Sequence, residues 1–163
     1  MKTILCLLLV LALLSAFGLS PFSGREAQEL NPARTLLANF SEAGVRLTTE
    51  NGQSGFGATW DEAVQNLKNS SVGAAFLQTA ERIVVCGAQW MDLAAVALSD
   101  ALRPAAQVYA GQQVEDAAAA QEYLDTRPSA VTVGELKTAI AQKQALPSLP
   151  EVRDENGTLI YAD

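Results

Sequence analysis

The side chains best placed to bind a ligand or a partner are two tryptophans, Trp60 and Trp90. Each stands where a loop runs into a predicted helix. Gly87 lies between a predicted strand and the helix that Trp90 begins, and loops at that end of an α/β sheet commonly bind ligands. Trp60, Gly87 and Trp90 are therefore the candidate ligand or partner surface. The alternative is that each tryptophan packs as a lid on the core beside its helix.

Catalytic chemistry has little support in the residue types. The chain has no histidine, which excludes Ser-His-Asp and Cys-His nucleophile systems and removes the commonest metal ligand. Asp92 and Asp100 share a predicted helix but stand about 12 Å apart along its axis, farther than paired glycosidase carboxylates. Cys86 lies in an apolar strand with no adjacent basic residue, which indicates a buried, unreactive thiol.

We accordingly predict no catalytic, cofactor-binding or metal-binding residues, and no enzymatic activity. A histidine-free hydrolase that uses Asp92 or Glu62 is the alternative. The glycine-rich segment from Asn51 to Ala58 runs into a helix start, where backbone amides can bind phosphate. It has no lysine after the last glycine and lacks GxGxxG spacing, so a flexible turn is the preferred interpretation.

The strand and helix on either side of Gly87 form the centre of the predicted fold. Ile83 to Cys86 is a short apolar run rich in β-branched residues, and this pattern predicts a buried central strand. Trp90 to Leu102 carries apolar residues at helical spacing and is stopped by Arg103-Pro104. Strand, turn and helix together make half of a βαβ unit.

Helix starts elsewhere are marked by capping boxes. Thr59 and Thr132 are each followed three residues later by glutamate, and this pairing satisfies the first free amides of a helix. The other predicted helices are Trp60–Asn69, Val114–Leu124 and Val133–Gln144. A strand over Val45–Thr49 is predicted to form a hairpin with Arg34–Phe40, and the alternative for the first strand is a helix capped by Asn31. Two more strands are predicted, one over Ala105–Ala110 and one beginning at Thr158.

These elements predict an α/β domain over residues 25–145, with α+β as the alternative class. Its sheet is expected to be single and mixed, with about four strands and with helices packed on it. Residues 146–163 are expected to be a linker and the start of a strand whose partner is missing or lies elsewhere. A chain of 163 residues suits one such domain with an export segment.

Residues 1–18 have the pattern of an export signal. Lys2 precedes an apolar core from Ile4 to Leu14, and the small residues of Ser15–Gly18 suit signal peptidase. The alternative is a membrane anchor helix, because Ile4 to Phe22 gives about 19 residues without a charge, close to the minimum for spanning a bilayer. Both alternatives predict an exported protein.

The charge balance is acidic. Acidic residues outnumber basic ones by 18 to 11, which gives a net charge of −7. Loss of Met1 to Gly18 would remove Lys2 and leave 18 against 10, or −8. Such a surface repels nucleic-acid phosphate and anionic lipid headgroups, so we expect no nucleic-acid partner. The charge would also keep an exported domain soluble.

The order of the motifs resembles the N-terminal domain of the Ger(x)C lipoprotein family, the C subunits of spore-germination receptors. The similarity covers about Val45 to Leu124. It is carried by the Thr-x-x-Glu-Ala-x-x-Asn-Leu run that begins at Thr59, by the strand Arg82–Gly87, and by the Arg103-Pro104 boundary before the next strand. Ala88 stands where the family has glutamate.

The resemblance implies a non-catalytic receptor subunit that works without a cofactor. Its partners would be membrane-embedded receptor subunits, and its place the outer face of the spore inner membrane, with membrane association through the N-terminal segment. The family's lipidated cysteine has no counterpart in Ser15–Pro21. Family members continue into further domains, so this chain is expected to be a truncated or stand-alone relative. A secreted domain that binds a small molecule near Gly87 to Trp90 is the alternative function.

Overall fold

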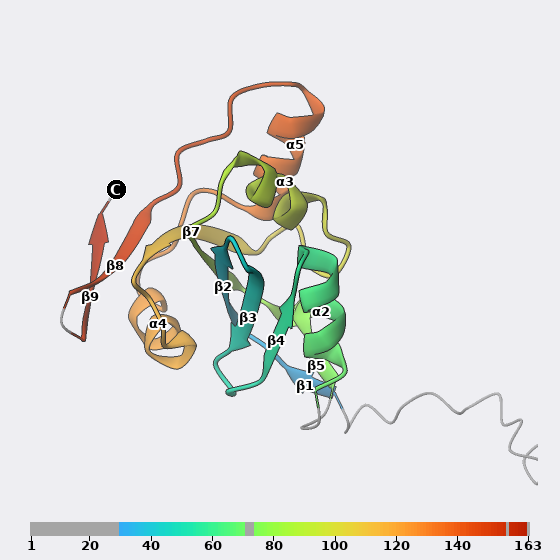
Figure 1. Ribbon diagram of the computed structural model, residues 1–163. Coiled ribbons are helices and arrows are strands. Elements are labelled where there is room, and N and C mark those ends of the chain that lie inside the picture. The colour runs from blue at the N-terminus through green and yellow to red at the C-terminus, as the bar shows by residue number, and fades with distance from the viewer. Residues whose placement is uncertain (1–29, 71–73, 156, 163) are drawn as a thin grey trace, which may run out of the picture. The chain divides into compact units, whose positions relative to one another are not determined.

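A mixed sheet of seven strands carries the fold, which the computed structural model describes for residues 30–70, 74–155 and 157–162. The strands follow the order β4-β3-β2-β6-β7-β8-β9 (Figure 1). The central strands β2 (Thr35–Ser41), β6 (Arg82–Cys86), β7 (Gln107–Gln112) and β8 (Glu151–Glu155) run parallel, whereas β3 (Gly44–Thr49), β4 (Ser54–Gly57) and β9 (Thr158–Ala162) are antiparallel to their neighbours.

The predicted α/β class and mixed sheet are confirmed, but the sheet has more strands than the expected four. A separate two-stranded sheet pairs β1 (Leu30–Pro32) with β5 (Ala74–Phe76). The hairpin of β2 and β3 forms as expected, in place of the alternative helix capped by Asn31. The added strands include β4, which has two glycines, and β8, which is mostly charged. Glycine and most charged residues are uncommon in strands, so the sequences of β4 and β8 did not predict strands.

Strands β8 and β9 extend the sheet beyond the expected domain boundary at residue 145. β8 joins β7 in parallel, and β9 folds back on β8 so that Val152 pairs with Tyr161. The strand predicted at Thr158 therefore has its partner within this chain. Val152 is fully buried, which ties this end of the chain to the core.

Both faces of the central strands are buried. Alternate residues of a strand point to opposite faces, so each strand contributes to two apolar layers. Fully buried residues at matching register positions are Leu36, Ile83 and Val108 on one face, and Leu37, Val84 and Tyr109 on the other.

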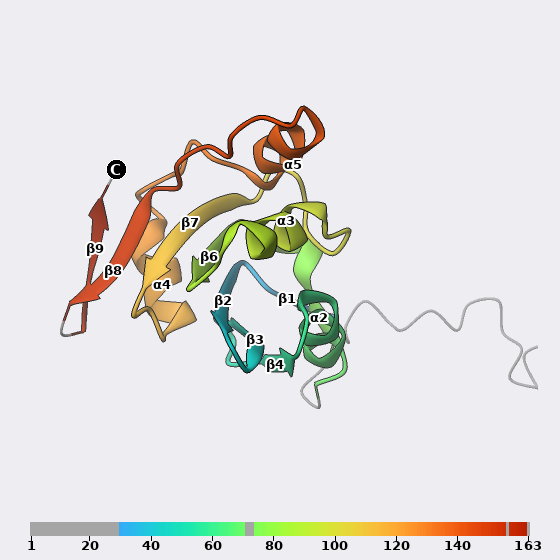
Figure 2. The same cartoon turned by 45° about the horizontal axis from the view of Figure 1, so that its top comes forward.

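Helices cover the two faces unequally. One face packs against α2 (Trp60–Lys68), α3 (Trp90–Leu98) and α5 (Val133–Ala141), and the other packs against α4 (Ala117–Leu124). Figure 2 shows α3 and α5 next to each other, and they are in contact. The one remaining helical turn among the described residues is a 3₁₀ turn, η2 (Leu77–Thr79).

Three of the predicted helices start at the expected residue, and the ends differ. α3 ends at Leu98 and α5 at Ala141, earlier than predicted. α4 begins at Ala117 because the side chain of Asp116 caps it by accepting from the amides of Ala118 and Ala119. An N-cap residue directly precedes its helix, whereas the predicted helix began at Val114 and so included Asp116 in its first turn.

The predicted signal peptide or anchor helix, residues 1–18, lies outside the described residues. Among the helices of residues 30–70, 74–155 and 157–162, none is long and apolar enough to cross a membrane.

Candidate functional site

Gly87 makes the turn that leaves the central strand. It has a positive φ of +68°, and a Cβ at this position would lie 2.6 Å from the carbonyl oxygen of Phe40. Both the backbone conformation and the space therefore favour glycine. Gly87 is exposed and lines two clefts, of about 340 and 470 Å³. Both lie at the carboxyl end of β6, where an α/β sheet commonly binds ligands.

The two clefts differ in the side chains around them. The smaller lies between the β2–β3 hairpin and the start of α3, and its charged lining residues are Glu42 and Asp92. The larger lies beside the ends of β6 and β7, and residues 147–151 close its other side. Apart from Glu151, its lining is uncharged.

Trp60 is a core residue. Its side chain is 3% exposed and stacks on Phe40, with ring centroids 6.2 Å apart and an angle of 10° between the planes. Its Nε1 is buried without a hydrogen-bond partner among the described residues. Trp60 therefore packs as a lid on the core, which is the alternative that its position in the sequence allowed, and it offers no surface to a partner.

Trp90 is on the surface, 56% exposed at the first position of α3. Met91 is 71% exposed and Leu98 is 53% exposed on the same helix. The sequence interpretation selected Trp90 but missed Met91 and Leu98. The signal was present, because α3 is apolar on the side that faces the core and on the side that faces solvent, whereas a surface helix is usually polar on its outer side.

Glu62 and Asp92, the carboxylates considered for hydrolysis, each accept a backbone hydrogen bond at the start of a helix. A Glu62 oxygen accepts a hydrogen bond from the amide of Ala58 at 2.9 Å, and the Thr59 hydroxyl accepts from the amide of Glu62 at 3.3 Å. At the start of α3, Asp92 accepts from the amide of Gln89 at 2.8 Å. Asp92 thus satisfies the amide of the α3 N-cap, and Glu62 satisfies the amide of the residue before the α2 N-cap.

Cys86 is a buried thiol at the end of β6. It is 8% exposed, and its Sγ lies 3.9 Å from the carbonyl oxygen of Val114. Burial raises the pKa of the Cys86 thiol, so it stays protonated at neutral pH and is a poor nucleophile. Within residues 30–70, 74–155 and 157–162, no group of three or more histidine, cysteine, aspartate or glutamate side chains could hold a metal ion.

A second charged region lies at the amino ends of the parallel strands. Arg34 pairs with Glu81 at 2.9 Å, and Arg82 pairs with Asp125 at 2.9 Å. The hydrogen bond from Arg34 is the largest of the causes that lower the pKa of Glu81. Arg34, Glu81 and Arg103 line a cleft of about 600 Å³. Sequence spacing gave no signal for this region, because its residues come from distant parts of the chain.

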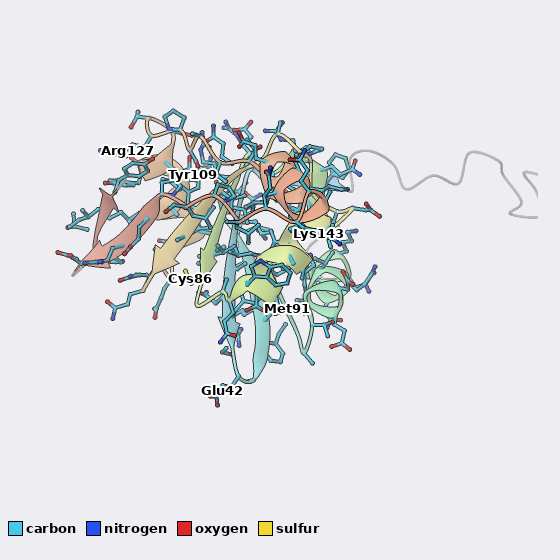
Figure 3. All side chains as sticks on the ribbon, turned by 90° about the horizontal axis from the view of Figure 1, so that it is seen from above. Glu42, Cys86, Met91, Tyr109, Arg127 and Lys143 are labelled. Carbon is cyan, nitrogen blue, oxygen red and sulfur yellow. The ribbon has the colours of Figure 1, made fainter. Side chains whose placement is uncertain are left out.

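The candidate surface is therefore the exposed side of α3, formed by Trp90, Met91 and Leu98, with the clefts beside Gly87 (Figure 3 labels Met91). It can bind by apolar contact, and Glu42 and Asp92 can attract a cation at one end. No protein-family model, curated protein or solved structure matches this chain.

Proposed function

We propose that this chain is an exported, non-catalytic subunit of a nutrient-germinant receptor, similar to the N-terminal domain of the Ger(x)C lipoprotein family. It acts in spore germination through protein contacts with membrane-embedded receptor subunits, at the outer face of the spore inner membrane. Residues 1–18 serve as its signal peptide or membrane anchor. The domain works without a cofactor.

The order of the motifs is the main support for this proposal. The Thr59 side chain caps the start of α2, although Glu62 accepts from the amide of Ala58 in place of the Thr59 amide that a full capping box requires. The Arg82–Gly87 run contains β6, and Arg103-Pro104 precedes β7. These motifs fall on or beside elements of one domain, in chain order, so they belong to one structural unit.

The local chemistry also favours a contact role. Glu62 and Asp92 are engaged at helix starts, and the Cys86 thiol is buried and protonated. The large apolar side chains on the outer side of α3 are available to a partner. Exposed apolar surface of this kind marks interaction sites.

Fractionation of spores provides the test. The full chain, tagged at its C-terminus in a spore-forming host, is expected in the inner-membrane fraction, where it co-purifies with multi-span membrane proteins after detergent solubilisation. Deletion of the gene is expected to slow germination in response to nutrients. A chain that is recovered only as a free soluble protein, with germination unchanged in its absence, would sink the proposal.

The DNA around the gene gives an independent observation. An open reading frame that continues beyond Asp163, or neighbouring genes for multi-span membrane proteins, would support the receptor function. Absence of both would count against it.

A secreted small-molecule-binding domain is the second candidate, and the two clefts at Gly87 favour it. A thermal-shift series with amino acids and sugars separates the two functions. A ligand at 100 times its dissociation constant stabilises the folded state by about 2.7 kcal/mol, which would raise the melting temperature by several degrees. No shift with any compound would leave the contact role as the better account.

A further inference from the structure

The outer side of α3 carries large exposed apolar side chains at both ends of the helix. Of the five large hydrophobic side chains exposed among the described residues, three lie on this helix: Trp90, Met91 and Leu98. The other two, Phe56 and Ile160, are on separate strands. Residues 90 and 98 are two helical turns apart on one side, and Ala94, which lies between them at the same spacing, is buried. The three side chains therefore form one stripe, which we call the α3 stripe.

The orientation of the stripe is fixed by the opposite side of the helix. Val96 and Ala97 are buried in the core, and α3 is in contact with both α5 and α2. Turning the stripe inward would expose these core residues, so the helix holds the stripe toward solvent. A rigid apolar ridge of this length suits the apolar face of a second helix.

Charges beside the stripe indicate the character of the partner. The cleft at the start of α3 is lined by Glu42 and Asp92 and by no lysine or arginine. The Glu42 carboxylate is exposed and has no hydrogen-bond or ion-pair partner among the described residues. In Figure 3, Met91 lies between Glu42 on the β2–β3 hairpin and Lys143 after α5. A partner seated on the stripe thus meets carboxylates at the Trp90 end.

We propose that the α3 stripe is the docking surface for an amphipathic helix of another protein, whose apolar face lies along Trp90, Met91 and Leu98. A lysine or arginine of that helix enters the cleft between Glu42 and Asp92. This inference rests on the proposed function, in which the helix belongs to a membrane-embedded receptor subunit. A lipid surface fits less well, because Glu42 and Asp92 at the Trp90 end of the stripe repel anionic headgroups.

Synthetic peptides and Trp90 fluorescence test the docking directly on the full chain. The probe is an amphipathic helical peptide of about 18 residues, with a leucine face and flanking lysines. One control has glutamate in place of the lysines, and the other is a scrambled sequence. Binding of the lysine peptide is expected to shift Trp90 emission to shorter wavelength, because docking removes its ring from water. The glutamate and scrambled peptides are expected to bind at least about tenfold more weakly.

Variants locate the binding on the stripe. The double variant Met91→Ser/Leu98→Ser is expected to weaken binding of the lysine peptide by about tenfold or more. Glu42→Gln is expected to weaken it severalfold and to reduce its dependence on salt. The matched control is Phe56→Ser, which removes an exposed aromatic ring on β4 and is expected to leave the affinity unchanged. Urea midpoints of all variants check that each is folded.

Three results would overturn the proposal. They are equal binding of the three peptides, an unchanged affinity in Met91→Ser/Leu98→Ser, and a Trp90 shift produced only by phosphatidylcholine–phosphatidylglycerol vesicles, which would assign the stripe to a membrane surface. Co-purification from spore membranes separates this failure from failure of the proposed function. If the double variant still co-purifies with the membrane proteins, the receptor function stands and docking through α3 does not.

Discussion

Helices α2 and α3 both begin with tryptophan, yet one tryptophan is buried and the other is exposed. Trp60 is 3% exposed and Trp90 is 56% exposed. In α2, Ala63, Val64 and Leu67 join Trp60 in the core, and the opposite side is polar. In α3, apolar residues occupy both sides. The first position of a helix therefore does not decide whether a tryptophan is buried. What decides it is the part of the protein that packs against that side of the helix.

The surface opposite α2 is built for close approach. Gly55 and Gly57 of β4 face the helix, and a Cβ on Gly55 would lie 2.4 Å from the Leu67 amide nitrogen. Without these side chains, α2 lies directly on the strand. The outer side of α3 has no such element over it among the described residues. Helix α2 therefore completes the fold, whereas α3 leaves apolar surface available for a partner.

Truncation of the two tryptophans should give the largest difference. Trp60→Ala is expected to lower the free energy of unfolding by about 3–5 kcal/mol, because it removes a buried ring and leaves a cavity beside Phe40. Trp90→Ala is expected to change it by less than about 0.5 kcal/mol. Urea denaturation of the two variants measures this. Equal losses would contradict the assignment of one ring to the core and the other to the surface.

The close approach of α2 is tested by adding one methyl group. Gly55→Ala is expected to cost about 3 kcal/mol of unfolding free energy, because the helix must move away from β4. The matched control is Gly52→Ala, whose added methyl meets no atom within 4 Å. It should cost only the strain of a positive φ, about 1 kcal/mol. If Gly55→Ala costs no more than this control, α2 does not depend on the missing side chain.

Removal of the capping side chain should destabilise α2 and α3 by similar amounts, although the outer sides of the two helices differ. Thr59→Ala removes the α2 cap, and Asp92→Ala removes the acceptor for the Gln89 amide at the start of α3. Each is expected to lower the free energy of unfolding by about 1 kcal/mol, measured by thermal or urea unfolding. A much larger effect in only one helix would mean that capping, rather than the opposing surface, separates α2 from α3.

The smallest expected effect on stability concerns Glu81, which directly precedes β6, the strand between α2 and α3 in chain order. Arg34 lowers the pKa of Glu81 in the folded protein. The carboxylate therefore adds stability above its unfolded pKa of about 4.3, and this contribution is lost as the pH falls through the lower folded pKa. Glu81→Gln should flatten the acid side of a stability–pH curve slightly, since the pair is partly exposed. An unchanged curve would show that the pair contributes nothing.

Local sequence signals predicted what local interactions determine. The run from Ile83 to Cys86 indicated the central strand, and the capping residues Thr59 and Thr132 indicated the first residues of two helices. The strand β4 was missed because the glycines that suggest a turn are needed there for helix packing. β8 was missed because it is mostly charged, and it is a strand through its backbone pairing with β7 and β9, which no local pattern records.

The candidate site could be predicted only in part, for the same reason. Gly87 and Trp90 were found because a strand, a glycine and a helix follow one another in sequence. The burial of Trp60 depends on Phe40, which is distant in the chain, and the cleft beside α3 needs Glu42 from the β2–β3 hairpin. Residues that meet only after folding carry no joint signal in one sequence.

The parallel pairing of β2 with β6 also has a consequence for the speed and order of folding. The ion pair between Arg34 and Glu81 joins residues 47 positions apart, and the segment between them includes β2, β3, β4, α2 and β5. Closing so long a loop costs entropy before its contacts form, so the central pair should be a slow step. During synthesis, the β2–β3–β4 meander and α2 can assemble first. The strand at the centre of the finished sheet is therefore expected to join a unit that has already formed.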